Sequence, residues 1–85
     1  MKKLVEVLTS ISNINDMKKF MDEILTEKEK KDLNLRWELM RKLKNGTPQR
    51  EIASTLGISL CKITRGAKIL KDKNAVSTKI LNNNL

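Results

Sequence analysis

The sequence has 85 residues, enough for one small domain, and a chain this short buries so little apolar surface that we expect a second copy to complete its core. It carries 18 Lys or Arg against 10 Asp or Glu, a formal net charge of +8, which favours a polyanionic partner such as nucleic acid or an anionic membrane surface, or else a solvated surface that only keeps the protein in solution. One cysteine and no histidine exclude a disulfide framework, a zinc cluster and a Cys–His or Ser–His catalytic pair. No glycine-rich phosphate loop is present either, so we expect neither an enzyme nor a metal site.

The first 25 residues predict two short helices. Apolar residues recur at helical spacing over Lys2–Ile11 and again over Met17–Leu25, and the polar stretch Ser12–Asp16 is typical of a turn between them. Glu6 and the polar residues after Leu8 interrupt the apolar run that follows the N-terminal lysines. We therefore expect no export signal and no membrane span, and a cytoplasmic protein.

A long helix is predicted from Thr26 to about Lys44. Thr26 and Glu29 have the spacing of a capping box, and the helix is acidic at its start and basic at its end. Arg36 projects from inside the apolar arc of this helix, where an unpaired buried charge is costly. It must reach water, a carboxylate such as that of Asp32, or a bound anion.

The stretch that follows is the most specific in the chain. Gly46 is expected to end the long helix, and Thr47 to cap the next one with Pro48 at its first position. The segment Gln49–Lys68, QREIASTLGISLCKITRGAK, then predicts a helix-turn-helix. In it an apolar pair lies on the first helix, a small residue lies where the helices cross, and a glycine makes the turn before an apolar plug. These residues are Ile52 and Leu56, Ala53, Gly57, and Ile58.

The second helix of this motif is expected to begin after Ser59 and to run to about Lys71. Its inward stripe is predicted to comprise Leu60, Ile63, Ala67 and Leu70. Its outward face comprises Cys61, Lys62, Arg65 and Lys68, with Thr64 at the margin. Cys61 fits a reducing compartment as a small exposed side chain. Ile69 lies on the cationic side, either as an isolated exposed residue or as the wall of a small-molecule cleft against the long helix. Residues 74–85 are expected to form a tail or helix, with Asn82–Asn84 frayed.

The segment Leu25–Lys71 resembles the bacterial tryptophan repressor family. The matching elements are LTEKE, then Arg36, then NGTPQREIASTLGIS, and finally ITRGAKILK, in the family's order. The resemblance implies an all-helical, intertwined homodimer with a dimerisation core in residues 1–45 and a DNA-reading head in residues 48–71. It also implies that L-tryptophan, as corepressor, raises affinity for a double-stranded DNA operator.

The resemblance also implies roles for individual residues. For tryptophan, Arg36 and Arg65 would sandwich the indole, Gly66 would line the pocket, and Leu25 and Thr26 would contribute from the partner subunit, although Thr26 is equally well explained as a cap and Leu25 as core. Ile69 stands where the family usually carries a hydroxyl residue that receives the ligand's amino group, which an isoleucine cannot do.

For DNA, the matching positions lie at the start of the first motif helix and along the second. They are Gln49 and Arg50, then Leu60, Cys61 and Thr64, with Lys62 and Lys68 as electrostatic contacts. Arg50 is suited to a guanine, a phosphate or an intrahelical pair. Ala53 stands where the family often has lysine, so the operator sequence does not transfer.

Three functions follow from these patterns. The first is a dimeric repressor gated by tryptophan. The second keeps the fold but binds DNA constitutively or answers another small effector, as Ile69 permits. The third is a helical interaction module whose basic surface only solubilises it.

Overall fold

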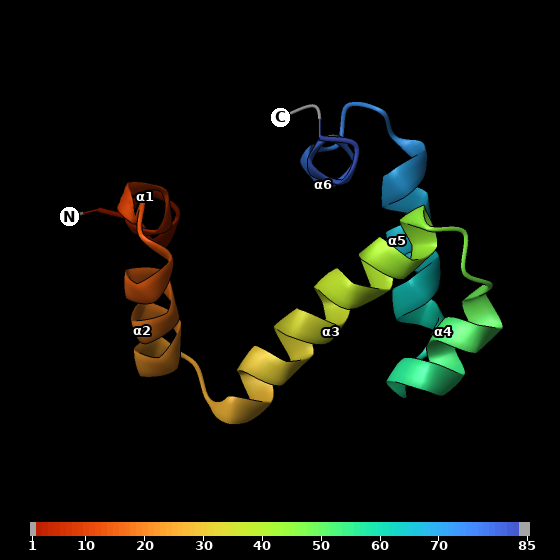
Figure 1. Ribbon diagram of the computed structural model, residues 1–85, viewed down its shortest axis with the longest axis horizontal. Helices are drawn as coiled ribbons and strands as arrows, with labels where there is room; N and C mark the ends of the chain where they lie inside the picture. The colour runs from red at the N-terminus through yellow and green to blue at the C-terminus, as the bar shows by residue number, and fades with distance from the viewer. Residues whose placement is uncertain (1, 84–85) are drawn as a thin grey trace. The chain divides into compact units, whose positions relative to one another are not determined.

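The computed structural model describes residues 2–83, which contain helices and no strand (Figure 1). The helices are α1 (Leu4–Ser10), α2 (Ile14–Ile24), α3 (Glu27–Lys44), α4 (Gln49–Leu56), α5 (Leu60–Lys71) and α6 (Val76–Leu81). The predicted all-α class is therefore confirmed. The chain divides into two compact units, Met1–Asp32 and Leu33–Leu85, and the division falls within α3. The predicted partition into a dimerisation core and a reading head concerns the dimer and stays a prediction.

The start of α2 differs from the prediction. The side chain of Asn13 accepts hydrogen bonds from the backbone N–H groups of Asn15 (2.8 Å) and Asp16 (3.1 Å), which satisfies donors that a helix leaves free at its first turn. The helix consequently begins at Ile14, and the expected start at Met17 was wrong. The polar residues that suggested a longer turn are the cap and first turn of the helix.

The start of α3 is as predicted. The backbone N–H of Thr26 donates to Oε1 of Glu29 (2.8 Å), and the N–H of Glu29 donates to Oγ1 of Thr26 (3.1 Å), so the capping box is closed in both directions. These bonds favour the ionised carboxylate and lower the pKa of Glu29. One turn after Thr26, Nζ of Lys30 donates to Asp22 (2.6 Å) and Glu27 (2.7 Å), and these bonds raise the pKa of Lys30.

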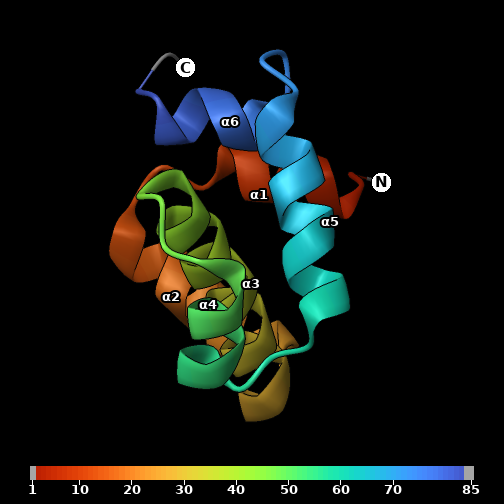
Figure 2. The same cartoon turned by 90° about the vertical axis from the view of Figure 1, so that its right-hand side faces the viewer.

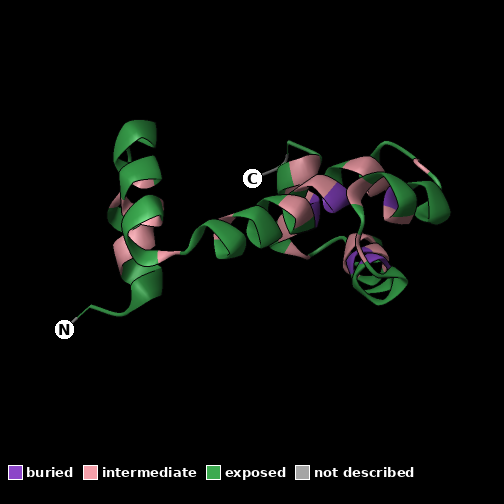
Figure 3. Cartoon of the chain, turned by 90° about the horizontal axis from the view of Figure 1, so that it is seen from below, coloured by how far each residue is buried: buried purple, intermediate pink, exposed green. Residues whose placement is uncertain are grey.

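The first unit contributes little buried surface. Neither α1 nor α2 contains a buried residue (Figure 3). Its exposed large apolar side chains are Leu4, Val5, Ile14 and Ile24. Most apolar residues of the faces predicted for these helices are half-buried, and Leu4, Val5 and Ile24 are exposed, so these faces are only partly covered within residues 2–32.

The core lies in the second unit. Among residues 2–83 the buried apolar side chains are Leu39 and Met40 of α3, Ile52 of α4 and Ile63 of α5. Ile52 and Ile63 have no exposed surface at all, which confirms the two central positions of the motif. Leu60 was predicted to point inward but is 52% exposed, because it is the first residue of α5 and lies beyond the side chains that form the core.

Two glycines shape the connections around α4. Gly46, at φ 85°, ends α3 as predicted, and its N–H donates to the carbonyl of Leu43 while the N–H of Thr47 donates to that of Lys42. This is the Schellman arrangement, and it uses Thr47 to close α3. The prediction that Thr47 caps α4 was therefore wrong, and Pro48 is the capping residue, without a side-chain bond.

The turn between α4 and α5 is as predicted (Figure 2). Gly57 adopts the left-handed conformation at φ 64°, and its N–H donates to the carbonyl of Ala53. Oγ of Ser59 accepts from the N–H of Lys62 (3.4 Å) and caps α5. Both α4 and α6 pack against α5.

The C-terminal segment forms a helix rather than a bare tail. The Oγ1 of Thr78, which is buried, donates to the carbonyl of Ile69 (3.1 Å) and ties α6 to α5. Asn82 and Asn83 follow α6 outside the helix, and the part of the predicted fraying that falls on Asn84 lies outside the described residues.

Candidate ligand cleft and nucleic-acid surface

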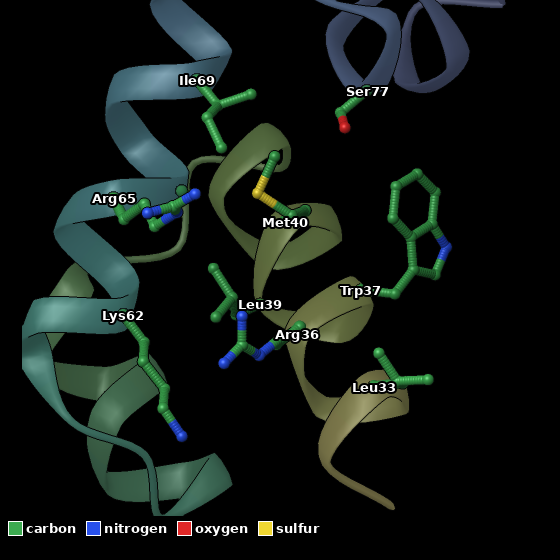
Figure 4. A pocket seen from close by; sticks show the side chains of 10 residues that line it. Leu33, Arg36, Trp37, Leu39, Met40, Lys62, Arg65, Ile69 and Ser77 are labelled. Carbon is green, nitrogen blue, oxygen red and sulfur yellow. The ribbon is translucent and has the colours of Figure 1, made fainter. Parts of the chain in front are cut away.

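A cleft of about 270 Å³ lies between α3, α5 and α6, close to the lower limit of roughly 300 Å³ for small-molecule pockets (Figure 4). Most of its wall is apolar or lacks a side chain: Leu33, Trp37, Leu39, Met40, Gly66 and Ile69. The polar groups are Arg36, Lys62, Arg65 and Ser77. The lining suits a flat apolar ligand that carries one charged end.

Gly66 sets the distance between the two main walls of the cleft. A Cβ atom at this position would lie 2.7 Å from Cδ1 of Leu39, 2.9 Å from Sδ of Met40 and 3.2 Å from Cδ1 of Leu43. The glycine therefore lets α5 lie directly against α3. The resemblance assigned Gly66 to the pocket lining; the structure shows it both at the cleft and in this close helix contact.

Cations from two helices converge on the cleft. Figure 4 shows the guanidinium of Arg36 directed from α3 toward α5 and the side chain of Arg65 on α5 facing it, while Lys62, also a lining residue, extends along α5 below Arg65. None of the three forms an ion pair within residues 2–83, so the alternative in which Arg36 pairs with Asp32 is not realised. Arg36 has the free, solvent-reaching position that an anion ligand requires.

The cleft brings together four of the six residues predicted for the ligand: Arg36, Arg65, Gly66 and Ile69. Leu25 and Thr26 do not line it. Their predicted contribution comes from a partner subunit and stays a prediction.

Sequence reasoning missed several residues of the wall. Leu33 and Met40 are one turn from Arg36 on the same helix face, and Trp37 is one turn from both Leu33 and Met40, so that spacing was a usable signal for them. Lys62 was predicted for DNA alone, although it lies three residues before Arg65 on the same helix. Ser77 comes from the C-terminal segment, where no pattern in the sequence indicated a role.

The residues predicted for DNA all lie on the surface of α4 and α5. Every one of them is exposed: Gln49, Arg50, Leu60, Cys61, Lys62, Thr64 and Lys68. Residues 33–85 hold eleven Lys or Arg and three Asp or Glu, so the entire formal charge of +8 belongs to this unit. An exposed cationic helix of this kind is suited to the phosphates and base edges of a DNA groove.

Fold and site together define a class: a small helical protein in which two helices joined by a tight turn present a basic surface beside a ligand-sized cleft. The chain belongs to the Trp repressor protein family, whose model matches residues 1–85. This is a family of DNA-binding transcription regulators and not of enzymes.

Curated relatives agree with the family. The chain is 43% identical over 72 residues to Trp operon repressor homologs of Xylella fastidiosa strains M23, Temecula1 and 9a5c, a match that covers 84% of this chain and 78% of each relative. No solved structure matches the chain significantly. Within residues 2–83 no helix is both long and apolar enough to cross a membrane.

Proposed function

We propose that this chain is a homodimeric, sequence-specific transcriptional repressor whose operator affinity rises when L-tryptophan occupies the cleft. The observation that carries the proposal is the meeting of Arg36 from α3 and Arg65 from α5 at one largely apolar cleft, with neither cation paired in the described chain. Family membership supports DNA binding and repression.

In this proposal the indole lies between the two guanidinium groups. A planar guanidinium stacks on an aromatic face, and a cation over the face of an indole is attracted by its quadrupole. One of the arginines also meets the ligand carboxylate, and Leu25 and Thr26 of the partner complete the site. The apolar side chain of Ile69 packs on the ligand and makes no hydrogen bond to its amino group.

The ligand acts on DNA binding through α5. This helix forms one wall of the cleft and also carries exposed residues proposed for DNA, among them Cys61 and Thr64. A ligand wedged between α3 and α5 favours one orientation of α5, and it raises operator affinity by as much as it favours that orientation. In the homodimer the two α5 helices then enter successive major grooves, with Arg50 on a guanine and Lys68 on a phosphate. As a regulator of bacterial DNA, the protein acts in the cytoplasm.

The test is a calorimetric titration of L-tryptophan into the purified protein without DNA. We expect saturable binding of one ligand per chain, and loss of that binding in Arg65→Ala while the circular dichroism spectrum stays helical. The matched control is Arg41→Ala, because Arg41 also lies in this unit but pairs with Glu38 (3.2 Å) outside the cleft. Unchanged affinity in Arg65→Ala would contradict the proposed site.

A second candidate is favoured by Ile69. Because this residue removes a hydrogen-bonding partner for an amino group, the same fold is compatible with a different small effector or with constitutive DNA binding. The two candidates are distinguished by selecting the DNA duplexes that the protein binds from a random pool and then measuring its affinity for them with and without L-tryptophan. Tighter binding of the selected duplex in the presence of L-tryptophan supports the first proposal, and equal binding with and without it supports the second.

A further inference from the structure

The first turn of α5 carries a lysine that belongs to the cleft as well as to the DNA-facing surface. Lys62 lines the cleft and is exposed, three residues before Arg65 on the same helix, a spacing at which two helical side chains are neighbours. Its backbone N–H donates to Oγ of Ser59, which fixes the start of the helix. Its ammonium forms no ion pair within residues 2–83.

The charges around the cleft are unbalanced. Arg36, Lys62 and Arg65 place three positive charges at its walls, and no Asp or Glu is among the lining residues that the structure describes. Ser77 supplies the sole side-chain oxygen of that lining. A ligand ammonium therefore finds three like charges and no carboxylate, whereas a ligand carboxylate finds only attraction.

The three cations are of two chemical types, two guanidinium groups and one ammonium. A guanidinium is flat and suited to the face of a ring, whereas an ammonium on a flexible stem is a compact point charge suited to a carboxylate. When both arginines stack on the ligand and one of them also meets its carboxylate, the lysine supplies a further cation at the same cleft for that negative end.

We propose that Lys62 is a third ligand-binding cation, which contacts the ligand carboxylate and makes the cleft selective for aromatic ligands that carry a carboxylate. This inference rests on the proposed ligand-binding function and deepens it, since it names the carboxylate that the ligand class must carry. It also gives Lys62 a role in ligand binding that is present without DNA, in addition to its predicted role in DNA binding.

The experiment is calorimetry without DNA at low salt, with three probes that share the indole ring: L-tryptophan, indole-3-propionate and tryptamine. We expect Lys62→Met to weaken both carboxylates about threefold to tenfold, between the values for an exposed ion pair and for a hydrogen bond to a charged group. Tryptamine, which has the ammonium and no carboxylate, is expected to bind Lys62→Met as well as or better than the wild type.

The matched control is Lys71→Met. Lys71 is an exposed lysine of the same helix that does not line the cleft, so all three probes should bind this variant as they bind the wild type. Lys62→Arg keeps the charge and should retain carboxylate binding, whereas Lys62→Gln should weaken it about as much as Lys62→Met does. This second pair tests the inference even if Lys62→Met folds poorly.

The outcomes separate the two proposals. Carboxylate binding that is unchanged in both Lys62→Met and Lys62→Gln would overturn the inference and leave the proposed function standing. Equal weakening of tryptamine and the carboxylates would also overturn it, because a packing defect and not a charge would then be responsible. Absence of any binding by the wild-type protein would overturn the proposed ligand and the role of Lys62 together.

Discussion

Gly66→Ala tests the close contact between α3 and α5. The added Cβ would lie 2.7 Å from Cδ1 of Leu39 and 2.9 Å from Sδ of Met40, both shorter than side-chain carbons tolerate. Leu39 is almost fully buried and has little room to turn, whereas the flexible thioether of Met40 yields more easily. Overpacking of this kind costs about 1–3 kcal/mol. Replacing a glycine inside a helix by alanine returns about 1 kcal/mol of helix propensity, so we expect a net loss of about 1 kcal/mol in the free energy of unfolding.

The assay is urea unfolding followed by far-ultraviolet circular dichroism at one fixed protein concentration, since association contributes to stability. Leu39→Val removes the methyl group nearest to the new Cβ. The double variant with Gly66→Ala should therefore lose less stability than the sum of the single losses. An increase of about 1 kcal/mol in Gly66→Ala, the value from helix propensity alone, would refute the close approach of the helices.

Three further predictions concern stability. Ile63→Ala should lower the free energy of unfolding by about 2–5 kcal/mol in urea titrations, because Ile63 has no exposed surface, and a loss below about 1 kcal/mol would contradict its place in the core. Gly57→Ala should cost about 1–2 kcal/mol, because φ is 64° at this turn, and an unchanged thermal midpoint would show that the turn does not require it. Because hydrogen bonds to Thr26 lower the pKa of Glu29, its carboxylate stabilises the fold at neutral pH, and this contribution is lost as the pH falls through and below the usual glutamate range near about 4.3. Glu29→Gln should retain the cap yet flatten this part of the stability curve from pH 6 to pH 3, measured by thermal unfolding, and a curve identical to that of the wild type would contradict the assignment.

Features set by neighbouring residues could be predicted from the sequence. The capping box of Thr26 and Glu29, the left-handed turn at Gly57 and the cap at Ser59 each depend on a few adjacent atoms, and all three are present. The position of Arg36 inside an apolar helix arc left water, the Asp32 carboxylate and a bound anion open as its partners; in the structure it forms no ion pair with Asp32 and lines the cleft.

Features that depend on competing hydrogen bonds or on residues distant in the sequence could not be predicted from the sequence. Thr47 has the chemistry of a cap, but its N–H is used to close the preceding helix, which its side-chain type does not reveal. Leu60 continues the apolar stripe of α5 yet is exposed at the first residue of that helix, and the sequence does not reveal which residues of neighbouring helices lie beside it. Ser77 reaches the cleft only because Thr78 bonds to Ile69 and fixes α6 against α5.

The exposed apolar side chains of α1 and α2 bear on how folding of the proposed dimer would depend on protein concentration. With so small a core in residues 2–83, the proposed dimer would fold and assemble in one equilibrium, which would depend on the concentration of the chain itself. Dilution of that dimer would lower the folded fraction of the chain together with the dimeric fraction. In the proposed dimer, the concentration of the chain would therefore set the folded, dimeric fraction before any ligand is bound.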